Sequence, residues 1–177
     1  MTSNLSRILY SLLITSLVLV VLEIVSSAVF PALGLEEYRL SFNILIILFM
    51  ALKLESPYIA LFILVIQFFH GAFSVDGWAM GTIAGVLITI IIGYLKELLH
   101  LSTPVLTMLI TQVFQTVWFV IVSGLFWLRT GSWDVIQERF FRFLPESIVL
   151  SILAPLCFTL LEKIWRHKDA SMIRGEY

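Results

Sequence analysis

The chain has 177 residues, of which 60% are hydrophobic and 13% are charged, and its formal net charge is -1. Soluble domains are closer to about half apolar and about a quarter charged, so this composition indicates an integral membrane protein. The charge balance excludes a strongly basic nucleic-acid-binding surface. The single cysteine, Cys157, excludes a disulfide within the chain.

Six apolar stretches follow one another along the chain. A bilayer core of about 30 Å needs about 20 apolar residues per helix. Transmembrane helices are therefore predicted over about 8–30, 40–54, 58–73, 78–95, 104–127 and 146–165. The second stretch is short, and Arg39 and Lys53 at its ends could reach the two membrane interfaces. We expect a single all-α transmembrane domain, a compact polytopic bundle.

The segment between the fifth and sixth stretches is amphipathic. Aromatic and aliphatic residues recur at helical spacing, and charged residues occupy much of the remaining surface: Trp133, Ile136, Phe140 and Phe143 against Asp134, Glu138, Arg139 and Arg142. This pattern predicts a helix over about 132–144 that lies in the membrane interface. A connector packed on the bundle is the alternative.

The distribution of basic residues predicts the orientation. With a cytoplasmic N-terminus and six crossings, seven of the 11 Lys and Arg residues lie on the cytoplasmic side. An excess of Lys and Arg marks cytoplasmic segments, so we expect both termini inside the cell.

Small residues recur every four positions along the fourth stretch, at Gly77, Gly81, Gly85 and Gly93, with Thr89 filling the gap. Such a register lets another helix approach closely. It is either a docking face for a partner helix or a packing seam within the bundle.

The fifth stretch carries a polar stripe in the same register. It consists of Thr103, Thr107, Thr111 and Gln115, with Gln112 beside it. Polar groups at membrane depth must face protein or water. The stripe therefore indicates interhelical hydrogen bonds or a solvated ligand cavity.

Glu23 is the ionisable residue deepest in the first stretch. Ionisable groups at membrane depth are rare and point to function. Candidate partners for its carboxylate are Gln67 and His70 on the third stretch and Gln115 on the fifth. A carboxylate that reaches the outer interface is the alternative.

Signatures of common enzymes are missing from the sequence. It contains no HExxH, GxSxG or Walker-type motif, and its three histidines are dispersed. We therefore expect a protein that is not an enzyme and that holds no metal or cofactor.

Three stretches resemble the MreD family of bacterial rod-shape proteins. They are Gln67-Phe68-Phe69-His70-Gly71, Gly93-Tyr94-Leu95-Lys96, and the segment from Pro145-Glu146-Ser147 to Ala154-Pro155-Leu156. The chain departs from the family at Gln67, where an acidic residue is common. The resemblance implies a non-enzymatic inner-membrane scaffold or regulator of cell shape and peptidoglycan elongation. Its implied partners are the bitopic protein MreC, the elongation polymerase and transpeptidase, and, indirectly, the MreB cytoskeleton.

The MreD family is similar in fold to the solute-binding S-components of energy-coupling-factor vitamin transporters, which supplies the alternative function. A scaffold should have a packed centre and dock partners on the glycine register or at Trp133 and Phe140. A solute-binding subunit should have a hollow polar centre. Its cavity would be lined by Gln112, Gln115, His70 and Glu23.

Overall fold

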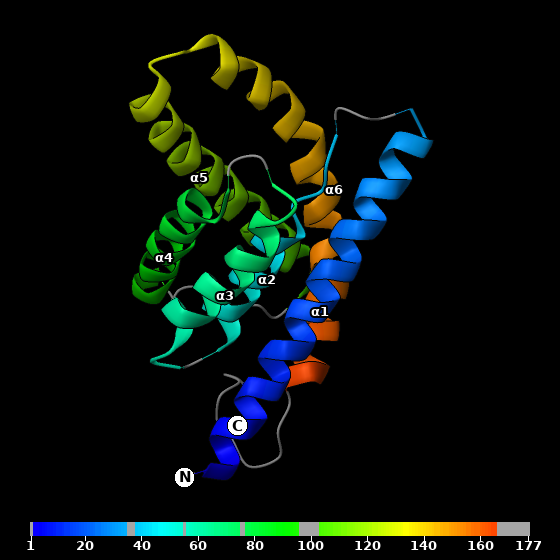
Figure 1. Cartoon of the computed structure of the whole chain (residues 1–177), viewed down its shortest axis with the longest axis vertical. Helices are drawn as coiled ribbons and strands as arrows, with labels where there is room; N and C mark the ends of the chain where they lie inside the picture. The colour runs from blue at the N-terminus through cyan, green and yellow to red at the C-terminus, as the bar shows by residue number, and fades with distance from the viewer. Residues whose placement is uncertain (1, 35–37, 55, 75–76, 96–102, 166–177) are drawn as a thin grey trace.

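The computed structural model describes residues 2–34, 38–54, 56–74, 77–95 and 103–165. These residues form helices and no β-strand, which confirms the all-α prediction for this part of the chain. The helices are α1 (Thr2–Ala32), α2 (Phe42–Lys53), α3 (Ile59–Gly71), α4 (Gly77–Leu95), α5 (Pro104–Thr130) and α6 (Asp134–Trp165) (Figure 1).

Four of these helices, α1, α4, α5 and α6, are long and apolar enough to cross a membrane. The other two have 12 and 13 residues. At about 1.5 Å per residue they are about 18–20 Å long, which is short of a hydrocarbon core of about 30 Å. The polytopic character predicted from the sequence is confirmed, but the count of six transmembrane helices is not supported.

The core of the bundle is the short helix α2. Every residue from Phe42 to Leu52 is buried, and the helix packs against each of the other five. A helix that is apolar around its whole circumference is typical of such a central position. The Phe49 ring meets the Phe158 ring of α6 edge-on, with centroids 5.6 Å apart. This part of the bundle is therefore solidly packed.

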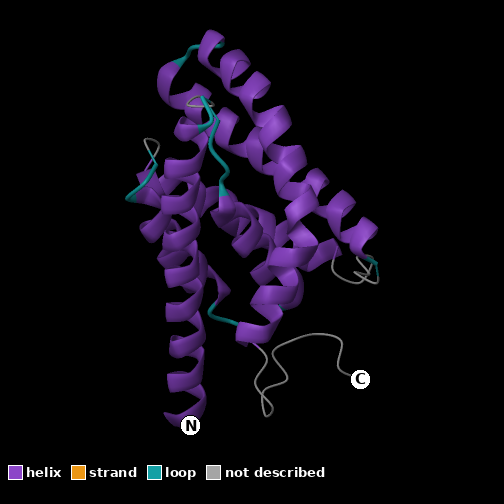
Figure 2. Ribbon diagram, turned by 90° about the vertical axis from the view of Figure 1, so that its right-hand side faces the viewer, coloured by secondary structure: helices purple, strands orange, loops and turns teal. Residues whose placement is uncertain are grey.

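The helices differ in how far they extend along the molecule. The first turn of α1 and the last turn of α6 lie at the same end, the lower end in Figure 1. Towards the other end, α5 and α6 continue well beyond the ends of α3 and α4 (Figures 1 and 2). The start of α2, the end of α3 and the start of α4 therefore lie short of the end of the molecule that α5 and α6 reach.

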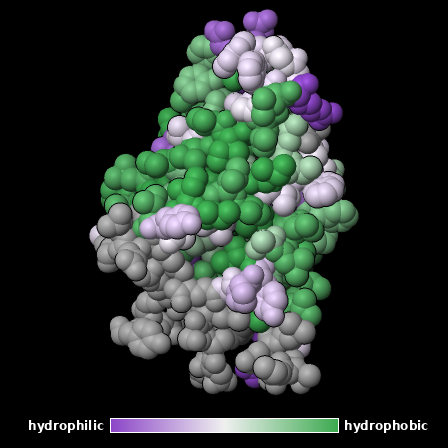
Figure 3. Space-filling model, turned by 90° about the vertical axis from the view of Figure 1, so that its left-hand side faces the viewer, coloured by the Kyte–Doolittle hydropathy of each residue, from purple (hydrophilic) through white to green (hydrophobic). Residues whose placement is uncertain are grey.

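The outer surface suits a lipid environment. Large apolar side chains of α1, α4, α5 and α6 are exposed, among them Leu13, Ile90, Val113 and Ile152. On the face drawn in Figure 3, apolar residues cover the middle and polar residues gather at the upper end.

The predicted interfacial helix over 132–144 is not separate from the sixth span. Both belong to α6, which contains Pro145 and Pro155. A proline inside a helix lacks the N–H that would bond the carbonyl four residues earlier, here those of Phe141 and Ser151, and membrane helices tolerate this loss where neighbouring helices pack against them. The Ser147 and Thr159 hydroxyls donate to the carbonyls of Leu144 and Pro155, at 2.9 and 2.8 Å.

The apolar face of the first turns of α6 packs on α5. Phe143 stacks on Phe119 with ring centroids 4.6 Å apart, and the Arg139 guanidinium lies 4.2 Å from the centre of the Phe126 ring. The prediction of a separate helix is therefore wrong, since this segment forms the first turns of α6 and its aromatic residues find apolar partners on α5. Its location in the membrane interface stays a prediction.

Candidate functional site

Glu23 of α1 is at the centre of a buried ionic cluster. Its side chain is 1% exposed, and its Oε1 lies 2.8 Å from His70 Nδ1 on α3. Its Oε2 lies 3.4 Å from the Arg39 guanidinium. Of the three predicted partners, the structure joins His70 to Glu23. The carboxylate is buried, and the partly exposed side chain of Arg39 turns towards it.

Arg39 extends this cluster to α6. Its backbone N–H donates to Glu146 Oε1 at 2.8 Å, and its guanidinium donates to the Ser27 hydroxyl at 3.3 Å. Non-helical backbone at membrane depth needs such partners because lipid offers none. Glu146 was not among the site residues predicted from the sequence. The available signal was a carboxylate next to a proline within an apolar stretch.

A cavity of about 260 Å³, here called the chamber, lies beside this cluster. Its lining comes from the start of α2, the end of α3, the start of α4 and the facing sides of α5 and α6, and includes His70, Arg139, Arg142 and Glu146. The chamber thus occupies the space above the short helices, between the two long ones. The bundle is packed around α2 and hollow above it.

Two amide side chains in the chamber lack hydrogen-bond partners. Gln67 of α3 is 0% exposed, and both its Oε1 and its Nε2 are unpartnered. Asn43, in the first turn of α2, is buried with an unpartnered Oδ1. Gly81 of α4 lies directly against the Gln67 amide, so that a Cβ at position 81 would overlap it.

The polar stripe of α5 joins α5 to α6. The Gln112 amide nitrogen donates to Ser147 Oγ at 3.0 Å, and Ser151 Oγ donates to Gln112 Oε1 at 2.7 Å. The Gln115 amide donates to Ser151 Oγ at 3.2 Å. Neither glutamine lines the chamber. Thr107 bonds within its own helix, to the Thr103 carbonyl, and the Thr111 hydroxyl is buried without a partner.

We expect Ser151→Ala to lower the free energy of unfolding by about 1 kcal/mol, because two interhelical hydrogen bonds of about 0.6 kcal/mol each are lost. Unfolding in lipid–detergent mixtures measures this change. Thr159→Ala is the control, since its exposed hydroxyl bonds only within α6. An equal loss in both variants would contradict an interhelical role for Ser151.

The glycine register of α4 faces inward over part of its length. Gly85 is buried, and a Cβ there would come within 2.8 Å of Ile63 Cγ2 on α3. Gly81 and Gly85 therefore form an internal seam and are not accessible to a partner helix. Gly77 and Gly93 have no atom within 4 Å of such a Cβ. The other predicted docking residues, Trp133 and Phe140, are exposed near the end of the molecule where α5 and α6 meet.

Comparison with protein-family models, with curated proteins and with solved structures finds no match. Within the described ranges, no cluster of His, Cys, Asp and Glu could hold a metal ion. Lys96, His100 and the basic tail after Trp165 lie outside the described residues. The fold and the site together define a multi-pass helical membrane protein with a buried ionic cluster beside a polar chamber.

Proposed function

We propose that this chain is a non-enzymatic scaffold or regulator of the bacterial inner membrane, acting in cell shape and peptidoglycan elongation as members of the MreD family do. Its direct partner is a bitopic MreC-like protein. Through that partner it acts with the elongation polymerase and transpeptidase and with the MreB cytoskeleton. The resemblance of residues 67–71, 93–96 and 145–156 to the family supports this proposal.

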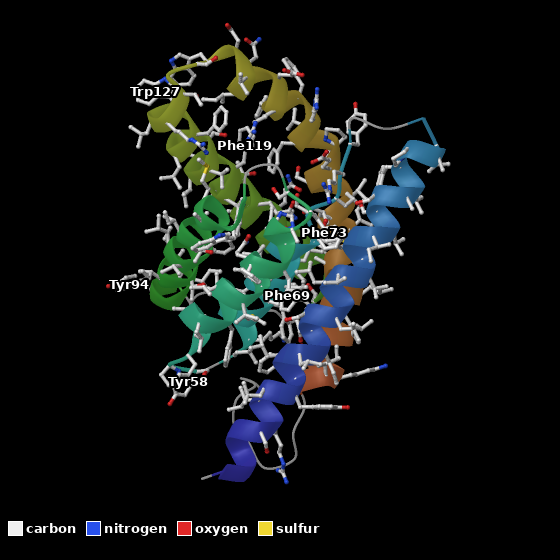
Figure 4. The ribbon with its side chains drawn as sticks, in the orientation of Figure 1. Tyr58, Phe69, Phe73, Tyr94, Phe119 and Trp127 are labelled. Atoms are coloured by element: carbon white, nitrogen blue, oxygen red, sulfur yellow. The ribbon has the colours of Figure 1, made fainter. Side chains whose placement is uncertain are left out.

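The observation that supports it most is an apolar groove of about 730 Å³ between α1 and α3. Its lining is almost entirely aliphatic and aromatic, with Leu9, Leu13 and Leu17 on α1 and Val65 and Phe69 on α3. Figure 4 shows Phe69 between these two helices. A single transmembrane helix of a bitopic protein fits such a groove, because helix association in lipid relies on close side-chain packing.

The packed half of the bundle also supports a scaffold function. The buried helix α2 fills the centre, and apolar residues such as Ile47, Ile63 and Ile88 are fully buried around it. A packed apolar core around α2 suits a protein whose partners bind on its outer surface. In this proposal both termini are cytoplasmic, and reporters fused to each end test that orientation.

Site-specific photocrosslinking in the native membrane tests the groove. A benzoylphenylalanine at Leu13 should capture the MreC-like protein, identified by mass spectrometry. The matched control is Val113 on α5, which is also apolar and exposed and lies outside the groove. Equal capture from both positions, or none from Leu13, would rule out the groove as the docking site.

The chamber favours the alternative, a solute-binding subunit like the S-component of an energy-coupling-factor transporter. It is polar and hollow, and it includes His70 from the predicted cavity residues. Affinity purification in mild detergent separates the two functions. Recovery of cell-wall elongation proteins supports the scaffold, whereas recovery of a coupling subunit with paired ATPases supports the transporter subunit.

A further inference from the structure

Among the buried side chains without hydrogen-bond partners in the described residues, Gln67 has both the oxygen and the nitrogen of its amide unpartnered. It is fully buried and lines the chamber. An amide removed from water without hydrogen bonds destabilises a fold. Glutamines 112 and 115 on α5 have serine partners on α6. Gln67 thus differs from Gln112 and Gln115 in that both polar atoms of its amide lack a partner and its side chain lines the chamber.

The geometry of the Gln67 amide defines which ligand groups could form hydrogen bonds with it. A carboxamide presents one N–H donor and one carbonyl acceptor side by side in a plane. Its complement is a planar group with an adjacent acceptor and donor, as when glutamine or asparagine pairs with the edge of a base. The unpartnered Asn43 Oδ1 in the same chamber accepts one further N–H. A carboxamide or lactam edge supplies all of these groups.

The walls of the chamber favour a flat ring. Trp118 and Phe119 of α5 and Phe143 of α6 line it, and Figure 4 shows Phe119 on α5 on the side that faces α6. Aromatic side chains stack on planar groups. Sites for drug-sized ligands have volumes of about 300–1,000 Å³. A chamber of about 260 Å³ therefore suits a molecule with a single ring.

The charged residues of the chamber already have partners in the protein. Arg142 pairs with Glu138, Arg139 lies over Phe126, and Glu146 accepts from the Arg39 backbone. An uncharged ligand leaves these pairs intact, whereas an ion would compete with them.

We propose that the chamber binds a small, uncharged, planar solute with a carboxamide or lactam edge, held by a two-point hydrogen bond to Gln67. This inference goes beyond the scaffold function and does not depend on which partner proteins the chain has. Gly81 is a positioning residue in this site, because any side chain there would displace the Gln67 amide.

Nicotinamide and 3-acetylpyridine are the probes. They share a ring and a carbonyl, but 3-acetylpyridine has a methyl group in place of the amide nitrogen. Binding to the full chain in phosphatidylcholine nanodiscs is followed by saturation-transfer NMR. We expect a Kd for nicotinamide on the order of 1 mM, as suits so few heavy atoms, and binding of 3-acetylpyridine that is about tenfold weaker. Equal binding of the two probes, or no binding of either at about ten times that concentration, would overturn the proposal and leave a chamber that holds only water.

Gln67→Leu separates this role from a structural one. We expect it to abolish the difference between the probes and to raise the unfolding temperature of the ligand-free protein by several degrees, because an unpartnered amide is replaced by an apolar side chain. Gln115→Leu is the matched control, since it removes a buried glutamine outside the chamber, and it should keep the preference for nicotinamide. Retained preference in Gln67→Leu, or a lower unfolding temperature, counts against the proposal, and neither result bears on the capture of partner proteins.

Discussion

His70→Leu is expected to lower the free energy of unfolding by about 1–3 kcal/mol, because it leaves the buried Glu23 Oε1 without its hydrogen-bond partner, while Arg39 still pairs with Oε2. Glu23 is held by His70 Nδ1 at 2.8 Å and by Arg39 at 3.4 Å. Its carboxylate is 1% exposed, so water cannot replace the lost imidazole. Unfolding of the purified protein in lipid–detergent mixtures measures the loss.

The double variant Glu23→Leu with His70→Leu is expected to recover most of that stability. Replacing both partners of a buried hydrogen-bonded pair by apolar side chains is often neutral or stabilising, in contrast to the removal of one partner. A double-mutant cycle should then give a coupling energy of about 2 kcal/mol or more. Glu138→Gln is the control, since the exposed pair with Arg142 contributes at most about 0.5 kcal/mol. Additive losses from the two single variants would show that Glu23 and His70 do not act as a pair.

Local signals in the sequence predicted the helix boundaries well where they were strong. The predicted start at Pro104 coincides with the start of α5, where the Thr103 hydroxyl accepts the Leu106 N–H at 3.3 Å. The span was predicted to end at about 127, whereas α5 continues to Thr130 and ends at Gly131 in the left-handed region, with φ of 66°, a conformation that glycine adopts readily. These features depend on residues within one helical turn, so the sequence contains them in full.

How deeply each helix is buried within the bundle could not be predicted in the same way. Hydropathy does not distinguish α2, which is buried on all sides, from a lipid-facing span, because both are uniformly apolar. Pro145 predicted a helix start because proline is common at the first helical position. In the structure α6 continues through it, since packing of Phe143 on Phe119 holds the preceding turns in place.

The composition of the site depends on contacts between distant segments. Arg39 lies 16 residues from Glu23 and 107 residues from Glu146 along the chain. Their positions within apolar stretches of the sequence identified Glu23 and His70 as unusual, because charged and titratable groups are rare there. It could not show that Gln67 lacks a partner, since an unmet hydrogen bond is a property of the assembled cavity.

Gly85→Leu is expected to destabilise the bundle by about 3 kcal/mol or more, because it forces a large side chain into a packed core. A Cβ at this position already approaches Ile63 Cγ2 to 2.8 Å and two carbons of Ile47 to 3.4 Å. Both isoleucines are fully buried, so neither can move aside without disturbing α2 or α3. The free energy of unfolding in lipid–detergent mixtures is the measurement.

Gly93→Leu is the matched control on the same helix and in the same register. No atom lies within 4 Å of a Cβ at position 93, and the residue is exposed. Its replacement should change stability by no more than about 0.5 kcal/mol, and leucine's better helix propensity favours a small gain. A loss from Gly93→Leu as large as that from Gly85→Leu would contradict this explanation by packing. A loss confined to Gly85→Leu means that the small residue at position 85 serves the contact of α4 with α2 and α3.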